Sequence, residues 1–476
     1  MVKWFSLIII IPIIVVFCSC TEKPIDPPSP NPDSSAFNIE ILRPWEGDTV
    51  FEMLKIIAEA DTELDYVQIV IDTLIRIDSL KPFISTFDVS LFESGNYNAV
   101  VTGFMGSVSE SAKVEVIIEN THCDSLEPII INGIEISEHK AFRSQAGCVL
   151  ALYMNSMGLT DPNCLNGIEE YSLTLKWLYL HGNELTSLDI SPLQGFTSLE
   201  LIKLDNNNLE SLDLSPLMNL PSFEVLQASN NNLDSIDLYP LSTCRKLSNI
   251  DISYNELSAS DFTCFNQCSE LKYMDLKGNC YTSMDLTFLS NCIRLQDLDL
   301  SENQIENLNL DPLADLIRLE NLLLSNNSIE LIDLDALRNC SKLYQLDLSY
   351  NSIDSIDLEP LYNLRELEIL KLWVNNLEVV NLDPLSTCEN IKEIYLSRNE
   401  IDSIILDPLA DCLKLQIFQI GVNNLRSIDL TPLWDLEELE EIWVNYNPFD
   451  TAACLGVCAF QDAHSHIAVV TDCECN

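Results

Sequence analysis

The sequence of 476 residues is poor in the residues on which most catalytic sites depend. It holds only 5 histidines and 13 glycines, and it has no glycine-rich loop of the kind that cradles a phosphate. It also lacks the strand-to-helix elbow motif that exposes a nucleophile in many hydrolases. We therefore expect neither an enzyme nor a bound cofactor.

Basic residues are scarce as well. The chain has 25 lysines and arginines against 74 aspartates and glutamates, which gives a formal net charge of -49 at pH 7. A surface of that sign repels phosphate backbones, so nucleic acid is excluded as a reasonable partner. Apolar residues make up 47% of the chain, enough for a core, and the length predicts two or more folded units.

The apolar run at the N-terminus is too short for a membrane-spanning helix. Residues 4–17 are apolar apart from Ser6, whereas a span needs about 20 residues. Lys3 supplies the positive flank of a secretory signal. The run ends in the four residues FCSC, the last of which is Cys20; they resemble the lipobox of bacterial lipoproteins, although Phe17 replaces the commoner leucine.

The lipobox resemblance implies a signal peptide over residues 1–20 and lipid attachment at Cys20. No aspartate follows Cys20, so the known signal for retention at the inner membrane is absent, and the outer membrane or cell surface is favoured. An ordinary secretory signal or an uncleaved anchor is the alternative. The only expected contact with a membrane is through the lipid.

A spacer and a small all-β domain are expected next. Residues 21–36 contain five prolines, a composition typical of an extended, semi-rigid tether. Over residues 37–119 apolar and polar residues alternate, as at Val67, Ile69 and Ile71, which predicts an antiparallel sandwich with one buried face.

The turns of this segment resemble those of bacterial immunoglobulin-like domains. Pro44, Gly47 and Val50 are followed later by Gly95 and Tyr97 in the spacing of that family. The segment has no cysteine, so the domain would lack an inter-sheet disulfide. The expected role of this domain is that of a spacer, with ligand binding as the alternative.

An asparagine recurs every 24 residues through most of the remaining chain. Apolar residues stand three and five positions before it, as Leu300 and Leu298 do before Asn303. Twelve such asparagines follow one another without an insertion: Asn183, Asn207, Asn231, Asn255, Asn279, Asn303, Asn327, Asn351, Asn375, Asn399, Asn423 and Asn447. A period of this length predicts a solenoid, and the pattern resembles the leucine-rich-repeat family.

The resemblance implies a parallel sheet of short strands on the concave face and short helices on the convex face. We assign twelve coils to residues 177–449. A cap at residues 120–176 would hold an irregular first coil, in which Leu150 and Leu152 precede Asn155. Each asparagine amide is expected to satisfy backbone groups that the bend leaves unpaired.

The convex side shows a helix-start signal. Eight positions after the asparagine a Ser, Thr or Asp is usual, and proline follows it in eight of eleven coils, for example Pro192, Pro312 and Pro432. We interpret the Ser, Thr or Asp as the residue that caps a short helix or 3-10 turn of roughly two turns.

Two further positions of the repeat carry a recurring polar or reactive residue, an aspartate at one and a cysteine at the other. Six positions after the asparagine, an aspartate recurs, as at Asp213 and Asp357; we interpret it as a solvated turn face, with cation binding as the alternative. Thirteen positions after it, cysteine alternates with leucine and phenylalanine, so these cysteines are expected to be core residues. They are Cys244, Cys268, Cys292, Cys340, Cys388 and Cys412.

Cysteines also gather at both ends of the solenoid. Residues 450–476 are predicted to form a cap with two disulfides, the candidates being Cys454, Cys458, Cys473 and Cys475. A zinc site with His464 and His466 is the alternative. Cys123, Cys148 and Cys164 flank the first coil, where one bridge is expected to help close that end.

The concave face remains as the candidate binding surface, since its outward residues vary from coil to coil. Its centre is acidic, and its C-terminal coils carry outward aromatic residues, which favour a contact surface. The candidate binding residues are Trp373, Tyr395, Trp443, Lys371, Asp251, Asp275, Asp299 and Asp347. We expect recognition of a protein partner; a glycan ligand, or a structural envelope protein without a ligand, are the alternatives.

Overall fold

The computed structural model describes residues 39–43, 48–50, 53–60, 66–71, 74–78, 83–88, 95–105, 108–118, 129–144 and 148–475. The expected signal peptide with Cys20, the proline-rich tether and Cys123 lie outside these residues. The chain divides into two compact units, Met1–Glu119 and Asn120–Asn476. No helix of the described residues is long and apolar enough to span a bilayer.

The described part of the first unit consists of strands at the places where the apolar residues alternate. They form one sheet in the order β1-β3-β6 and another in the order β2-β8-β7-β4-β5, and every pair is antiparallel except β2 with β8. Ile69, Ile71 and Val101 are fully buried, and Ile69 is paired with Val101. The strands are β1 (Ile39–Arg43), β2 (Asp48–Val50), β3 (Met53–Ala60), β4 (Tyr66–Ile71), β5 (Leu74–Asp78), β6 (Phe83–Asp88), β7 (Gly95–Met105) and β8 (Val108–Ile118).

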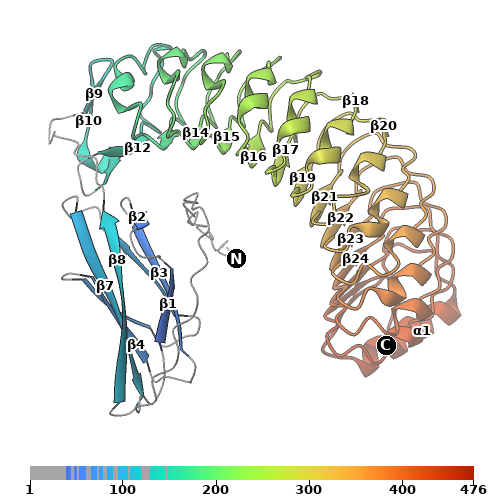
Figure 1. Cartoon of the computed structure of the whole chain (residues 1–476). Helices are drawn as coiled ribbons and strands as arrows, with labels where there is room; N and C mark the ends of the chain where they lie inside the picture. The colour runs from blue at the N-terminus through green and yellow to red at the C-terminus, as the bar shows by residue number, and fades with distance from the viewer. Residues whose placement is uncertain are drawn as a thin grey trace. The chain divides into compact units, whose positions relative to one another are not determined.

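The second unit is a curved solenoid with one long sheet along its inner side (Figure 1). All neighbouring strands of this sheet are parallel except β11 and β12, and their registers place equivalent residues of successive coils side by side. The strands are β11 (Ala141–Arg143), β12 (Val149–Tyr153), β13 (Trp177–Tyr179), β14 (Leu201–Lys203), β15 (Val225–Gln227), β16 (Asn249–Asp251), β17 (Tyr273–Asp275), β19 (Asp297–Asp299), β21 (Asn321–Leu323), β22 (Gln345–Asp347), β23 (Ile369–Lys371), β24 (Glu393–Tyr395), β25 (Ile417–Gln419), β26 (Glu441–Trp443) and β27 (Ala468–Val470). Two smaller pairs are β9 (Ile129–Ile131) with β10 (Ile134–Ile136) and β18 (Ser283–Met284) with β20 (Asn307–Leu308).

The outer side carries 3-10 helices of three to five residues, shorter than the two turns expected from sequence. They are η1 (Glu138–Lys140), η2 (Ile168–Tyr171), η3 (Ser191–Leu193), η4 (Ser215–Leu217), η5 (Tyr239–Thr243), η6 (Thr263–Gln267), η7 (Thr287–Asn291), η8 (Asp311–Leu313), η9 (Asp335–Asn339), η10 (Glu359–Leu361), η11 (Asp383–Thr387), η12 (Asp407–Leu409) and η13 (Thr431–Leu433). The one described α-helix, α1 (Thr451–Ala463), follows the last coil.

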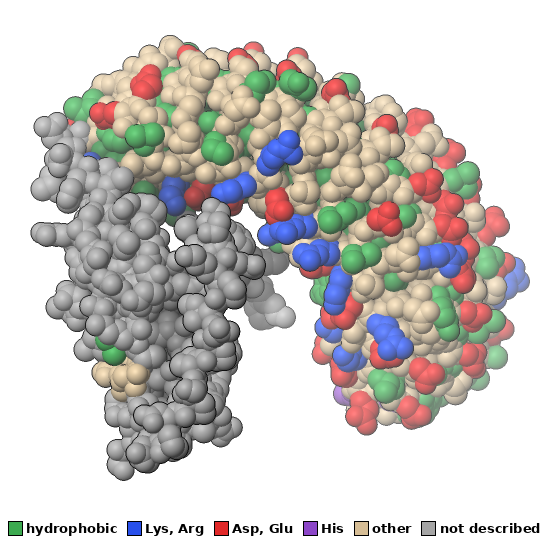
Figure 2. All heavy atoms as spheres, in the orientation of Figure 1, with side chains coloured by type: hydrophobic (Ala, Val, Ile, Leu, Met, Phe, Trp, Pro, Cys, Tyr) green, Lys and Arg blue, Asp and Glu red, His purple; other side chains and the backbone are tan. Residues whose placement is uncertain are grey.

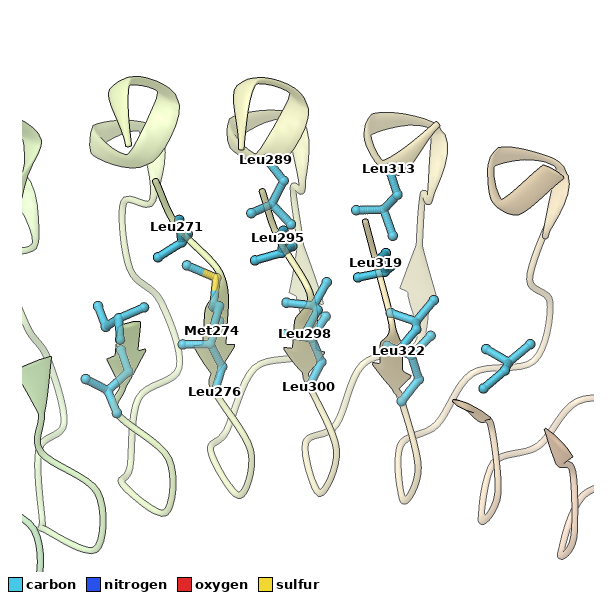
Figure 3. Close-up of a cluster of buried hydrophobic side chains, with 14 of the residues drawn as sticks. Leu271, Met274, Leu276, Leu289, Leu295, Leu298, Leu300, Leu313, Leu319 and Leu322 are labelled. Atoms are coloured by element: carbon cyan, nitrogen blue, oxygen red, sulfur yellow. The ribbon is translucent and has the colours of Figure 1, made fainter. Parts of the chain in front are cut away.

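One hydrophobic core runs through the solenoid between the strands and the 3-10 helices. Each coil contributes leucines from the same slots, as Leu295, Leu298 and Leu300 show beside their equivalents in the next coils (Figure 3). All three are fully buried. Because one coil cannot cover its own apolar face, the stability of each coil depends on its two neighbours.

The asparagines form a continuous hydrogen-bonded ladder, as the sequence predicts. The Nδ2 of Asn303 donates to the carbonyls of Leu300 in its own coil at 3.0 Å and Leu276 in the preceding coil at 3.1 Å. Its Oδ1 accepts the N–H of Tyr281 at 3.2 Å. The same three-way arrangement recurs from Asn207 to Asn447. It satisfies backbone groups that would otherwise be unpaired in a dry interior.

The cap of most 3-10 helices of the coils is made by a different residue from the one expected; η12, which follows Ile405, has no such cap. The residue eight positions after the asparagine makes no side-chain cap. Instead, the aspartate two residues earlier accepts its backbone N–H, as Asp189 does from Ser191 and Asp261 from Thr263, both at 2.9 Å. Asparagine performs the same role at Asn309. The aspartate column is therefore a solvated turn face, as expected, and its side chains also cap the turns.

The first coil has another register than the one expected. Leu152 is paired with Leu178, which places Met157, and not Asn155, in the slot that asparagine fills elsewhere. Met157 packs partly buried against the core, and its backbone N–H donates to Asn183 Oδ1 at 2.9 Å. The ladder thus begins at Asn183, because an apolar side chain closes its free end.

The C-terminal end is closed by α1, β27 and two disulfides. Cys454 is bonded to Cys473, and Cys458 to Cys475. These bridges use all four cysteines of the cap, which removes the zinc alternative. His464 instead places its ring nitrogens 2.9 Å from the carbonyl of Phe460 and 3.0 Å from that of Trp434. At the other end Cys148 is disulfide-bonded, whereas Cys164 is a buried free thiol.

All six cysteines of the repeated column are buried, as expected of core residues. Five of them also place their thiol near a carbonyl of the preceding coil, as Cys292 does with Phe265 at 3.6 Å and Cys244 with Leu217 at 3.3 Å. Burial raises the pKa of Cys292 to about 12 and that of Cys244 to about 11. These side chains therefore stay neutral and act as small apolar residues with a weak donor.

Replacing Cys292 with alanine is expected to lower the free energy of unfolding by about 1–2 kcal/mol, because the void is small and one weak hydrogen bond is lost. Binding at the concave face should not change. Denaturant unfolding and a binding titration of the same variant measure the two effects. A loss of binding with unchanged stability would mean that this column has a functional role.

Candidate functional site

The concave face is formed by the outward residues of the central strands. In most of them the middle residue is buried and the two flanking residues are half-buried. Lys and Arg side chains gather along this inner side (Figure 2). Several are paired with carboxylates, for example Lys203 with Asp205 at 3.2 Å and Lys277 with Glu302 at 3.1 Å, so the face is not a free basic surface.

The acidic centre lies where the sequence places it. The register puts Asp251 beside Asp275 and Asp275 beside Asp299. Each also accepts a backbone N–H two residues further on, as Asp275 does from Lys277 at 3.0 Å. Burial, with repulsion from the two neighbouring carboxylates, raises the pKa of Asp275 to about 7. Burial also raises the pKa of Asp299. Asp347 lies two coils further, beyond Leu323.

The raised pKa of Asp275 predicts a pH-dependent stability. The carboxyl binds its proton more tightly in the folded than in the unfolded chain, so its contribution to stability is present below about pH 4 and is lost as the pH rises through 7. Asp275→Asn is expected to match the wild type near pH 4 and to exceed it by about 1–2 kcal/mol at pH 8. Denaturant titrations at both pH values measure this.

Asp357→Asn is the control for that titration. Asp357 is an exposed cap on the convex side, where asparagine makes the same bond in other coils. Its replacement should change stability little at either pH. A difference between Asp275→Asn and the wild type that does not grow with pH would contradict the prediction.

The three predicted aromatic residues lie on the C-terminal half of the face but are not equally exposed. Trp443 has 37% of its surface exposed, whereas Trp373 and Tyr395 are half-buried. The ring of Trp373 stands edge-on to Tyr350 at 4.9 Å between centroids. All three rings therefore lie on the face as expected, but only Trp443 is exposed, and Tyr350 covers part of the Trp373 ring.

Lys371 and Tyr395 lie in adjacent strands and in register. Lys371 Nζ is 3.8 Å from Asp347 and 6.0 Å from the centre of the Tyr395 ring. The hydroxyl of Tyr395 donates to Glu393 at 2.8 Å. One strip of the face thus joins an acidic, a basic and an aromatic side chain, which suits the recognition of a mixed polar and apolar surface.

The sequence analysis missed a second aromatic group, at the N-terminal end of the same face. The rings of Tyr153 and Tyr179 are stacked at 4.8 Å, and Phe142 lies 6.3 Å from Trp177. Trp177 also donates through its indole nitrogen to Glu200 at 3.0 Å. The signal was the column six positions before the asparagine, which begins with Trp177.

The flank of the solenoid holds a groove of 750 Å³ lined by Asp213, Asp237 and Asp261. These carboxylates are the turn caps, and each already accepts a backbone N–H at 2.9 Å. Within the part of the chain that the structure describes, no three His, Cys, Asp or Glu side chains are grouped to hold a metal ion. The carboxylates that line the groove are thus explained by their role as turn caps.

The fold and the repeated core define a leucine-rich-repeat solenoid. The family model for the leucine rich repeat matches residues 174–233, 245–305 and 317–377, which confirms the repeat predicted from the sequence. No curated protein sequence matches the chain.

Solved structures show the same fold. An internalin from Listeria monocytogenes aligns with 24% identity and a TM-score of 0.56, over 69% of this chain and 90% of that one. A plant peptide hormone receptor aligns with 21% identity and a TM-score of 0.52, over 59% of this chain and 49% of that one. Toll of Drosophila aligns with 23% identity and a TM-score of 0.52, over 63% of this chain and 43% of that one.

Proposed function

We propose that the chain is a non-enzymatic surface protein that binds a protein partner through the concave face of its solenoid. The observation that carries this proposal is that the repeated asparagine position is constant, whereas the outward positions of the concave face vary. The asparagine ladder recurs unchanged from coil to coil, whereas the outward concave residues change from aromatic to acidic and back to aromatic. A packing requirement alone would not produce this variation.

Two of the similar structures support a protein as the partner. The plant receptor was solved in complex with RGF2, and Toll in complex with Spatzle. We place the site on the C-terminal coils, around Trp373, Tyr395 and Trp443, because buried aromatic anchors carry most of the energy of protein interfaces. Lys371 and Glu393 would form its polar border.

Site-specific cross-linking tests this placement. A photoreactive amino acid is introduced at Gln419, which lies between Tyr395 and Trp443 in register. The control position is Tyr239, on the outer side and 66% exposed. Incubation with envelope and extracellular fractions should give a protein adduct at Gln419 and none at Tyr239. Equal adducts at both positions, or none at either, would contradict the proposal.

We further propose that a lipid on Cys20 anchors the chain at the cell surface. The lipobox-like run supports this, and the proline-rich segment and the all-β unit, which resembles immunoglobulin-like domains, would act as spacers. Labelled fatty acid should be incorporated into the wild-type chain and not into Cys20→Ala. Labelling of that variant, or a mature N-terminus elsewhere, would refute the anchor.

A further inference from the structure

The residue directly before each ladder asparagine has a left-handed backbone. In every one of the twelve coils its φ is positive, between 51° at Tyr254 and 68° at Gly182. The backbone N–H of this residue donates to the next coil, as that of Val374 does to Ser397 at 2.9 Å. The conformation is therefore imposed by coil stacking and not by the residue that occupies the position.

The residue types at this position change along the solenoid. Five of the first seven coils use glycine or asparagine: Gly182, Asn206, Asn230, Gly278 and Asn326. The last five coils use none: Tyr350, Val374, Arg398, Val422 and Tyr446. A left-handed backbone suits glycine and asparagine, whereas it places the Cβ of other residues too close to the following carbonyl. In β-branched residues it is a clear outlier.

Val374 and Val422 are those outliers, with φ of 58° and 56°. Asparagine would fit both positions with less strain, as it does in the earlier coils. Val422 is 39% exposed, so burial of its side chain does not account for the choice. Persistent strain of this kind points to a functional surface.

Four of these residues form an apolar edge beside the concave face, which we call the rim strip: Tyr350, Val374, Val422 and Tyr446. Tyr350, Val422 and Tyr446 are exposed. The strip continues into the concave face through the contact of Tyr350 with Trp373. Arg398, also exposed, lies between the two valines.

Exposed carboxylates follow the rim strip along the same coils. Asp354 and Glu378 stand four residues after Tyr350 and Val374, and Glu400 and Asp402 stand two and four residues after Arg398. The next coil has Arg426 at the equivalent place. Acidic side chains cover the outer surface of the C-terminal coils (Figure 2). The edge is thus apolar apart from Arg398, and its border is acidic beside Tyr350, Val374 and Arg398 and basic at Arg426.

We propose that the rim strip binds a segment of the protein partner that presents apolar side chains bordered by lysine or arginine. The apolar side chains would pack on Tyr350, Val374 and Val422, and the basic ones would face the adjacent carboxylates. The proposal rests on the proposed function of the concave face and extends that site over its edge. The strain at the two valines is retained because these side chains contact the partner.

The proposal predicts opposite effects on stability and binding. The double variant Val374→Asn and Val422→Asn should raise the melting temperature of the full chain by about 2 °C or more, since the strain is relieved. The same variant should bind a peptide that has an apolar centre flanked by lysines about tenfold more weakly than the wild-type chain does. Asn230→Val is the matched control: it introduces the strain in a coil distant from the strip, so it should lower the melting temperature and leave binding unchanged.

Three synthetic peptides serve as probes in calorimetric titrations. One has a Phe-Leu-Trp centre flanked by lysines, the second has the same centre flanked by glutamates, and the third has serines flanked by lysines. The first should bind the wild-type chain, and the other two at least tenfold more weakly. Three results would overturn the proposal: the second peptide binds as tightly as the first, the first peptide does not bind, or the valine double variant binds the first peptide as tightly as the wild-type chain does.

The two proposals fail in different ways. An adduct at Gln419 together with unaltered binding by the valine variant would leave the concave site in place and remove the rim strip. Loss of binding in the valine variant with no adduct at Gln419 would show that the edge binds a partner and the concave face does not.

Discussion

Replacing Asn303 with alanine is expected to lower the free energy of unfolding by about 3 kcal/mol or more. The substitution leaves the N–H of Tyr281 and the carbonyl of Leu276 without their side-chain partner in a dry core. Each unsatisfied buried group costs about 1–3 kcal/mol. The bonds also join two coils, so the loss weakens the stacking on which both depend. Denaturant unfolding measures the change.

Asn155→Ala is the control for this substitution. The structure places Asn155 outside the ladder, and only its backbone carbonyl is used, by Lys140 Nζ at 2.8 Å. Its replacement should change the free energy of unfolding by less than about 0.5 kcal/mol. Similar losses for both asparagines would contradict this register of the first coil, because they would indicate that Asn155 is part of the ladder.

Trp443→Ala is expected to weaken partner binding by about 2 kcal/mol, a factor of about 30, with little change in melting temperature. Trp443 is the most exposed of the three aromatic residues and has no ring contact among the residues that the structure describes. Trp373→Ala should weaken binding to a similar extent, with a modest loss of stability because its contact with Tyr350 is removed. Titration of the cross-linked partner, once isolated, against each variant measures the affinities.

Trp434→Ala provides a matched tryptophan control. Trp434 is also exposed, but it packs edge-on against Phe460 of α1 at 5.7 Å and beside His464 at 4.7 Å. Its loss should therefore destabilise the C-terminal cap and leave affinity unchanged. If binding survives Trp443→Ala and Trp373→Ala, the acidic centre around Asp275 and Asp299 becomes the alternative site.

The repeat could be predicted from the sequence because the same residue types recur at the same spacing in every coil. Interior asparagines and leucines return at fixed spacing, so the solenoid, its core and the role of the Asn303 amide follow from pattern alone. The register of the first coil could not be predicted. Met157 stands where all twelve following coils have an asparagine, and the nearby Asn155 also follows apolar residues at the spacing of the repeat.

Features that depend on backbone angles were harder to predict. A Ser-Pro or Asp-Pro step marks a helix start but does not show which side chain caps it. The hydrogen bond from the Ser191 N–H to Asp189 depends on the backbone angles of the turn. The rim strip was missed because φ is not visible in a sequence. Its signal was present as the glycine and asparagine bias of one column, which ends before Tyr350.

The buried thiols have a consequence for folding in an oxidising compartment. The described chain has nine free cysteines as well as the four of the C-terminal cap. During synthesis the coils emerge before the cap, and a coil that stacks removes any thiol it carries from oxidants while the cap is still unformed. Packing thereby separates the cysteines in time: the thiols of the coils are buried before the four cysteines of the C-terminal cap can pair. A substitution that delays stacking should give mispaired, covalently scrambled chains before it gives unfolded ones.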